Sequence, residues 1–266
     1  MRSNNNEFFY QLISLLMAVI VVHVIYVAMV RPLAQQDIAD SLAAEQAGAG
    51  YEVPRSFVVV IKDFEQEACF ILMLWALSIM AYKARLSSRE ISMLAMQINE
   101  LKEGSRILPE DANALLRPLD SLPEQQRSLL VPRTLRTALT RFAVTGSVQT
   151  ATYAVTESCN TEGDRLDSEL SMVRYITWAI PSIGFIGTVR GIGAALGQAH
   201  EAVQGNIAGV TGSLGVAFNS TLVALLISMV VMFFMHQLQQ RQERLVLDTR
   251  AYSEANLLRH LKSGPR

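Results

Sequence analysis

Four long apolar blocks set the strongest limit on what this chain can fold into. They cover residues 8–30, 68–82, 176–199 and 214–235. A hydrocarbon core about 30 Å thick needs roughly 20 helical residues to cross it, and the first, third and fourth blocks reach that length. The blocks predict an all-α integral membrane protein with four transmembrane helices, at about residues 8–30, 64–82, 175–199 and 212–236.

The composition of the chain fits a membrane protein. Half of its 266 residues are hydrophobic and only 18% are charged, which is little for a soluble domain. The formal net charge of -1 gives no clustered basic face, so no nucleic-acid partner is expected. Cys69 and Cys159 fall in different parts of the chain, which argues against a disulfide framework and a zinc site. We find no nucleophile–base pair or phosphate loop, and therefore expect neither an enzyme nor a cofactor.

The first two spans need separate arguments. The first apolar run is too long for a signal peptide and lacks a small-x-small cleavage site, so it is interpreted as a retained span. The second run is short. A crossing there has to include Phe64 and put Glu65 and Glu67 at the membrane interface, or thin the bilayer locally.

The positions of Lys and Arg decide the predicted orientation. Basic residues follow span two, precede span three and follow span four, which assigns those flanks to the cytoplasm: Lys83, Arg85, Arg89, Arg165, Arg174, Arg241 and Arg244. The acid-rich loop at residues 31–62 and the loop at 200–212, which has no Lys or Arg, are expected outside. Both chain termini are then cytoplasmic.

Four regions follow from this topology. They are an N-terminal membrane hairpin with its outer loop (1–83), a helical cytoplasmic domain (84–173), a channel-like hairpin (174–236) and a cytoplasmic C-terminal helix (237–266). Apolar periodicity in the second region predicts helices at 87–102 and 129–155, and a third at 157–173 that runs on into span three. In the outer loop, Gly48, Gly50 and Pro54 mark a turn, and residues 57–61 form either a strand or the approach to span two.

Spans three and four each carry a stripe of small residues on one helix face. The first stripe has Gly184, Thr188, Gly191 and Ala195, and the second has Ala217, Thr221, Ala224 and Ser228. Such stripes often serve only to pack membrane helices closely. Thr188 and Thr221 lie about 18 Å and about 13 Å from the outer ends of their spans. This pair either lines a narrow polar path or hydrogen-bonds to its own helices.

Two motifs in these spans resemble a known family. Pro-Ser-Ile-Gly-Phe-Ile-Gly-Thr-Val-Arg-Gly-Ile at residues 181–192 resembles the ExbB and TolQ signature, in which a proline, Gly-x-x-Gly-Thr-Val and Trp-Gly-Ile follow in order. Ala-Phe-Asn-Ser-Thr-Leu-Val-Ala at 217–224 resembles the family's Ala-Leu-x-x-Thr-x-x-Gly. The chain is thus similar to the MotA/TolQ/ExbB proton channel family over about residues 157–236, and its four-span layout is more like MotA than like three-span ExbB.

The resemblance implies an ion-driven motor subunit of the bacterial inner membrane, forming a pentamer around two copies of a single-span MotB/ExbD/TolR-like partner. Thr188 and Thr221 are implied to line the path by which H⁺ or Na⁺ reaches an aspartate of that partner. Pro181, Gly184, Gly187 and Gly191 are implied to shape the helix of span three. Ala217 and Ser220 are implied to lie beside the second threonine, with Ser220 part of the ion pathway. The alternative function is a membrane scaffold that conducts no ions and uses the small-residue faces to oligomerise.

The sequence also suggests that a partner supplies the ion carrier. Buried carboxylates are the usual carriers of protons through membranes, and no Asp or Glu lies within the four spans proper. The carrier is therefore expected on another chain, and His23 is the only internal candidate apart from the terminal His236.

Two residues depart from the family pattern. Arg190 stands where the family commonly has Trp, and Ala224 stands where it has Gly. An arginine inside a membrane costs at least about 2.5 kcal/mol unless it is paired or hydrated. Arg190 lies about 130° around the helix from the small-residue face. It is either a snorkelling or carbonyl-bound structural residue, or a counter-charge to Glu65, Glu67 or a partner carboxylate.

Overall fold

The computed structural model describes residues 2–46, 56–94, 106–205 and 207–262, and it is 90% helical. No strand forms in these residues, where Ile107 and Leu261 make an isolated bridge. Four helical runs among them are long and apolar enough to cross a membrane: Glu7–Ser41, Phe64–Leu94, Val148–Gly197 and Ala208–His260. The predicted all-α fold with four transmembrane helices is confirmed.

The chain divides into two compact units. The membrane unit contains Met1–Ala81 and Met172–Met235, and the helical unit contains Tyr82–Ser171 and His236–Arg266. The four apolar blocks thus fall almost entirely in the membrane unit. The side of the membrane that each terminus occupies stays a prediction.

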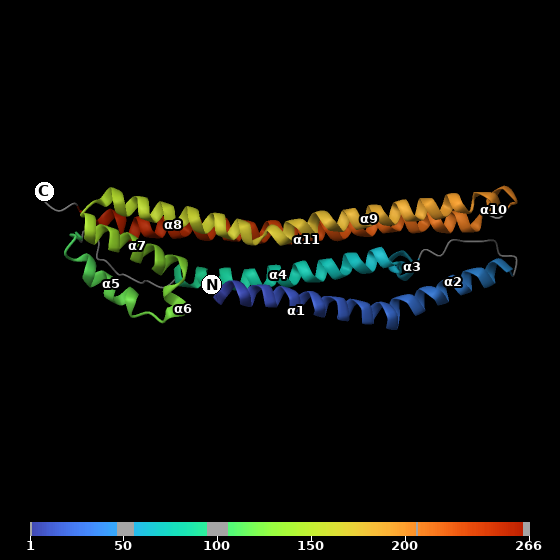
Figure 1. Cartoon of the computed structure of the whole chain (residues 1–266), viewed down its shortest axis with the longest axis horizontal. Helices are drawn as coiled ribbons and strands as arrows, with labels where there is room; N and C mark the ends of the chain where they lie inside the picture. Colours follow the sequence, from blue (N-terminus) through green and yellow to red (C-terminus); the bar gives the residue numbers. More distant parts are fainter. Residues whose placement is uncertain (1, 47–55, 95–105, 206, 263–266) are drawn as a thin grey trace. The chain divides into compact units, whose positions relative to one another are not determined.

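The first span belongs to a longer helical run than the sequence predicts. Helix α1 (Arg2–Ile25), the π-helix η1 (Tyr26–Val30) and α2 (Arg31–Gln46) follow one another without a break (Figure 1). The prediction of a loop from residue 31 is therefore wrong as far as Gln46. The Arg31 N–H donates to the Tyr26 carbonyl, five residues back. This wider turn precedes Pro32, whose ring clashes with the carbonyl four residues back in an α-helix.

The approach to the second span is helical. Residues 57–61 form the short helix α3 (Phe57–Ile61), so the strand alternative is wrong and the approach alternative is right. Helix α4 (Phe64–Leu94) contains the second span and the first part of the helix predicted at 87–102. The predicted turn residues Gly48, Gly50 and Pro54, and the rest of that predicted helix, lie outside the described residues.

Spans three and four lie in α9 (Ser171–Gly197) and α11 (Ala208–Asn256), with the short α10 (Ala199–Val203) between them. As predicted, a helix, α8 (Val148–Glu169), leads into α9, and Leu170 alone separates the two. The predicted tail helix is the last part of α11 and is followed by the 3₁₀ turn η2 (Leu258–His260).

The remaining elements of the helical unit are α5 (Ala112–Asp120), α6 (Glu124–Arg127) and α7 (Leu130–Thr145). The single helix predicted at 129–155 is wrong, because the chain turns between α7 and α8. Gly146 adopts a φ of 62°, a left-handed conformation that glycine tolerates best, and the Ser147 hydroxyl accepts the Thr150 N–H at the start of α8. Large apolar side chains from α5, α7 and α8 form the core of this unit, with Phe142 at its centre.

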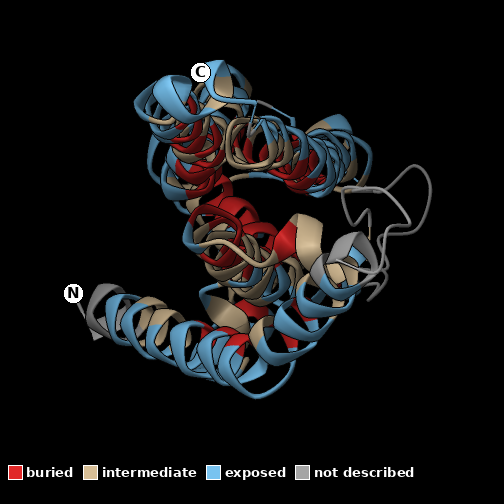
Figure 2. Cartoon of the chain, turned by 90° about the vertical axis from the view of Figure 1, so that its right-hand side faces the viewer, coloured by how far each residue is buried: buried red, intermediate tan, exposed pale blue. Residues whose placement is uncertain are grey.

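Burial follows the sides of helices that face other helices (Figure 2). Helix α1 is mostly exposed, and buried side chains recur at Ala18 and Val22 of α1 and at Tyr26 of η1. Both cysteines, Cys69 and Cys159, are buried free thiols.

Candidate ion-pathway site

Helices α9 and α11 pack along a seam of small residues. Gly184, Gly187, Gly191 and Ala195 are buried on α9, and Ala217, Ser220, Ala224 and Ser228 are buried on α11. The sequence stripes are therefore brought together. The structure adds Gly187 and Ser220 to the two faces, whereas Thr188 and Thr221 lie at the margin and stay partly exposed.

The glycines set how closely the two helices approach. A Cβ on Gly191 would lie 2.7 Å from the Ala217 backbone nitrogen and 2.8 Å from the Ser213 carbonyl oxygen. A Cβ on Gly187 would lie 2.5 Å from the Ser220 Cβ. Real Cβ atoms do not come so close to other heavy atoms, so any larger residue would push α9 and α11 apart.

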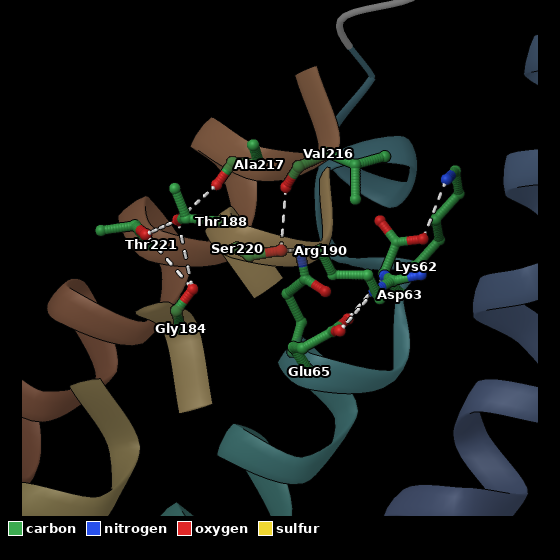
Figure 3. A network of polar contacts seen from close by, with 11 residues as sticks. Lys62, Asp63, Glu65, Gly184, Thr188, Arg190, Val216, Ala217, Ser220 and Thr221 are labelled. Atoms are coloured by element: carbon green, nitrogen blue, oxygen red, sulfur yellow. Dashed lines mark hydrogen bonds and ion pairs between the residues drawn. The ribbon is translucent and has the colours of Figure 1, made fainter. Parts of the chain in front are cut away.

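The two threonine hydroxyls meet at this seam (Figure 3). Thr188 Oγ1 and Thr221 Oγ1 are hydrogen-bonded to each other. Thr188 Oγ1 also lies 3.0 Å from the Ala217 carbonyl oxygen and 3.3 Å from that of Gly184. Thr221 Oγ1 lies 3.3 Å from the same Gly184 carbonyl. The bond from Thr188 to Gly184 is the i−4 bond expected of a threonine that only packs. The bond between the hydroxyls, that from Thr188 to Ala217 and that from Thr221 to Gly184 cross the seam and are additional.

This pair has more acceptors than protons. Each hydroxyl carries one hydrogen and accepts through its oxygen, and two carbonyls and the other hydroxyl lie within reach. Several donor arrangements therefore fit the same heavy-atom positions. Such a pair can pass a proton by reorienting its hydroxyls, without any movement of the backbone.

Apolar side chains on the outside of the bundle flank the threonine pair. One turn away from Thr188 on α9, Phe185 is 64% and Ile192 41% exposed, and one turn from Thr221 on α11, Phe218 is 67% and Leu225 48% exposed. The margin that carries the hydroxyls is therefore an apolar surface, of a kind that contacts lipid or another helix.

The proline of span three has a specific partner. Pro181 lies inside α9 and has no N–H for the Thr177 carbonyl, four residues back. The Ser228 hydroxyl of α11 donates to that carbonyl at 3.2 Å. Within a membrane such a freed carbonyl has to find a donor in the protein. Ser228, which the sequence suggests only as a small packing residue, is this donor.

Arg190 forms a two-pronged ion pair with Glu65 of α4 (Figure 3). Its Nε donates to Glu65 Oε1 at 2.7 Å and its Nη2 donates to Glu65 Oε2 at 2.8 Å. The Glu65 side chain is 11% exposed and that of Arg190 is 52% exposed. Of the alternatives for Arg190, the structure has the counter-charge to Glu65 and not a snorkelling or carbonyl-bound residue.

The next two residues of α4 contact the other helices of the bundle. Gln66 Nε2 donates to the Ser220 hydroxyl at 3.4 Å and to the Val60 carbonyl at 3.1 Å. Glu67, with its side chain 7% exposed, accepts from Arg31 and lies 2.7 Å from His23 Nδ1. The first turn of α4 therefore links to α1, α2, α9 and α11.

Sequence reasoning named Glu65 as a possible partner of Arg190, but it did not predict the contacts of Gln66 and Glu67. Glu65 and Glu67 are buried in the first turn of α4, and their place at the membrane interface stays a prediction. Matching the charges could have found these contacts. Glu65 and Glu67 lie at the start of span two, Arg31 follows span one, and Arg190 lies inside span three. A buried charge needs a partner, so these four residues were the natural candidates for pairing.

The comparison with known families agrees with the motifs in α9 and α11. Residues 127–251 match the sequence model of the MotA/TolQ/ExbB proton channel family. This match confirms the suspected MotA/TolQ/ExbB family over slightly less than half of the chain. No curated protein and no solved structure was found to match it.

The match and the four apolar helical runs together support a channel-type, multi-pass membrane subunit. The matched residues include α8, α9 and most of α11, and hence the whole small-residue seam. The family is one of membrane transport proteins and not of enzymes. In the part of the chain that the structure describes, no group of three or more His, Cys, Asp or Glu side chains forms a metal site.

Proposed function

We propose that this MotA/TolQ/ExbB family member is the ion-conducting subunit of an inner-membrane motor, and that protons, or Na⁺ in their place, pass along Thr188 and Thr221. The observation that carries the proposal is the hydroxyl pair itself. It bridges two helices at a partly exposed margin and has more acceptors than hydrogens. Threonines that only packed the seam would need no more than their own i−4 carbonyls.

The carrier that takes up the ion is proposed to come from a second chain. Glu65 and Glu67 lie in the bundle, but each is held by an arginine, Arg190 and Arg31 respectively. A carboxylate that binds and releases a proton in every cycle cannot remain tied to a permanent cation. A MotB/ExbD/TolR-like subunit with one span and one aspartate supplies a carboxylate without such a tie.

The apolar margin around the threonines suits this partner. Phe185 and Phe218 present exposed aromatic surface beside the two hydroxyls. A single helix lying there buries its apolar side and places its aspartate next to Thr188 and Thr221. We propose five copies of this chain around two such helices. Arg190 lies two residues along α9 from Thr188, about 200° around the helix, and so faces away from the partner.

Work follows from neutralising the partner aspartate. A protonated aspartate can move past an apolar surface that its charged form avoids. One charge that crosses 100 mV supplies about 2.3 kcal/mol, enough to bias a rotation step. With both termini in the cytoplasm, the partner carries its load on the outside.

Replacing Thr188 and Thr221 by valine tests conduction. Valine keeps the shape of threonine and removes the hydroxyl. The complex, purified with its native membrane partner and reconstituted into vesicles, should conduct protons, and either valine variant should reduce the flux at least tenfold. Thr177→Val is the matched control, because Thr177 lies on the same helix and its hydroxyl, the group that valine removes, donates to the Arg174 carbonyl of that helix. This control should keep full flux.

The competing function is a scaffold that conducts no ions, which the tight glycine seam would serve equally well. A scaffold assembles and works with valine at both positions. Unchanged flux in Thr188→Val and Thr221→Val, in complexes of unchanged size, would therefore reject the motor in favour of the scaffold.

A further inference from the structure

Three buried oxygen atoms near the start of α4 have no hydrogen-bond partner among the described residues. They are the Tyr26 hydroxyl, Asp63 Oδ2 and Gln66 Oε1. Tyr26 is 3% exposed and Gln66 is fully buried. Buried polar atoms in native proteins are almost always satisfied, by protein atoms or by ordered water.

The three atoms belong to one neighbourhood. Asp63 and Gln66 are separated by less than one helical turn. Tyr26 begins η1, and η1 packs against α3, the helix that ends two residues before Asp63. The ring of Tyr26 lies 6.4 Å from that of Phe70, one turn along α4 from Gln66. We call Tyr26, Asp63, Gln66 and Glu67 the α4 polar cluster.

The α4 polar cluster reaches the residue that precedes Thr221 on α11. Gln66 Nε2 donates to the Ser220 hydroxyl, and Thr221 is the next residue of α11. On α9, Gly187 lies beside Ser220 and Glu65: a Cβ there would lie 2.6 Å from Ser220 Oγ and 3.1 Å from Glu65 Cγ. Gln66 therefore joins the cluster to the site.

The chemistry of the three atoms selects their ligand. A hydroxyl both donates and accepts, whereas a carboxylate oxygen and an amide oxygen only accept. Water, with two donors and two acceptors, can serve all three, but a bare metal cation cannot accept from Tyr26. The charges agree, since Asp63 is paired with Lys62 at 3.2 Å and Glu67 with Arg31, which leaves no surplus negative charge to hold a cation.

We propose that the α4 polar cluster binds ordered water, and that this water is the chain's own route for protons to Ser220 and the threonine pair. The route rests on the proposed function, whereas the water binding does not. Gln66 is a positioning residue in this route. The π-helix η1 begins at Tyr26, and interruptions of this kind are frequent at functional sites.

Hydroxyl-radical footprinting of the native complex tests the water. Radicals generated by a short X-ray pulse arise from water at its binding site, so they oxidise buried side chains that touch water. Tyr26 should be oxidised at least tenfold faster than Phe142, a fully buried ring in the core of the helical unit. Tyr26 as unreactive as Phe142 overturns the proposal.

Proton flux tests the route. Tyr26→Phe, which removes only the hydroxyl, should reduce the flux at least threefold, and Gln66→Met should reduce it at least tenfold. Tyr10→Phe is the control, because the Tyr10 hydroxyl bonds Ser78 elsewhere in the membrane unit. Full flux in both cluster variants, with Thr188→Val inactive, overturns the route and leaves the proposed function standing. Full flux in Thr188→Val would instead reject the proposed function. Footprinting of Tyr26 would still test whether the cluster binds water.

Discussion

The two units of this protein are built in opposite ways. In the helical unit the largest apolar side chains lie inside, and Phe142, Leu135 and Leu139 are almost completely buried. In the α9–α11 seam around the threonine pair the facing residues are glycine, alanine and serine, while Phe185 and Phe218 point outward and large buried side chains such as Ile180 lie further along α9.

This difference in buried side chains reflects the solvent that surrounds each unit. In water the burial of large apolar groups drives folding. In a bilayer the lipid tails are as apolar as leucine, so helices associate through close backbone contact and hydrogen bonds. The seam, the Ser228–Thr177 bond and the Glu65–Arg190 pair are contacts of the second kind.

The strongest test of this difference removes one phenylalanine ring from each unit and compares the loss of stability. Phe142→Ala leaves a cavity in a packed core and should destabilise the protein by about 4 kcal/mol. Phe185→Ala removes a ring that is 64% exposed and should change stability by less than about 0.5 kcal/mol. Thermal unfolding in one detergent measures both, and equal losses would contradict the assignment of inside and outside.

The charge pair of the membrane unit should show the next largest effect. Arg190→Gln leaves the Glu65 carboxylate buried without its cation and should cost about 3 kcal/mol. Glu65→Gln leaves only the half-exposed Arg190 unpaired and should cost less. In the double variant both charges are gone, so its loss should be smaller than the sum of the single losses. Denaturant titration of the four proteins in detergent checks this, and strictly additive losses would mean that the pair is not coupled.

Much of the membrane unit could be predicted from the sequence, because apolar length and helical periodicity are local properties. They placed four spans and put Thr188 and Thr221 on facing stripes. Periodicity does not tell which helix a side chain meets. For this reason the sequence predicts only that Glu65 and Glu67 lie at the edge of a span, whereas Glu65, Gln66 and Glu67 each contact a different part of the bundle.

Helix ends were the other weak point. The helix continues from α1 into α2 because the π-helix η1 accommodates Pro32. Neither residue composition nor charge predicts a π-turn there. The turn between α7 and α8 depends on Gly146, which stands within one amphipathic pattern that continues on both sides. In both places the backbone geometry at one residue overrides the pattern around it.

Two glycines of α9 offer a finer comparison within one helix. Gly191 faces the seam, where a Cβ meets the backbone of α11, whereas a Cβ on Gly193 meets nothing within 4 Å. Gly191→Ala should cost about 2 kcal/mol through overpacking. Gly193→Ala should be neutral or stabilise the helix by up to about 1 kcal/mol, because alanine has the higher helix propensity. Unfolding in detergent measures both changes, and similar values would mean that close approach at the seam is not what holds α9 to α11.

The smallest expected effect concerns the turn of the helical unit. Gly146 has a φ of 62°, and a Cβ there would meet Pro109 Cγ at an ordinary 3.6 Å. Gly146→Ala therefore strains the backbone without a steric clash and should cost about 1 kcal/mol, the penalty of the left-handed conformation for an alanine. Gly146→Asn should cost less, because asparagine tolerates this conformation better. Since the turn belongs to the helical unit, proton flux should stay at the wild-type value in both variants while the unfolding midpoint falls in the order glycine, asparagine, alanine. A loss of flux at full stability would instead show that the turn acts on the channel and that the two units are not independent in function.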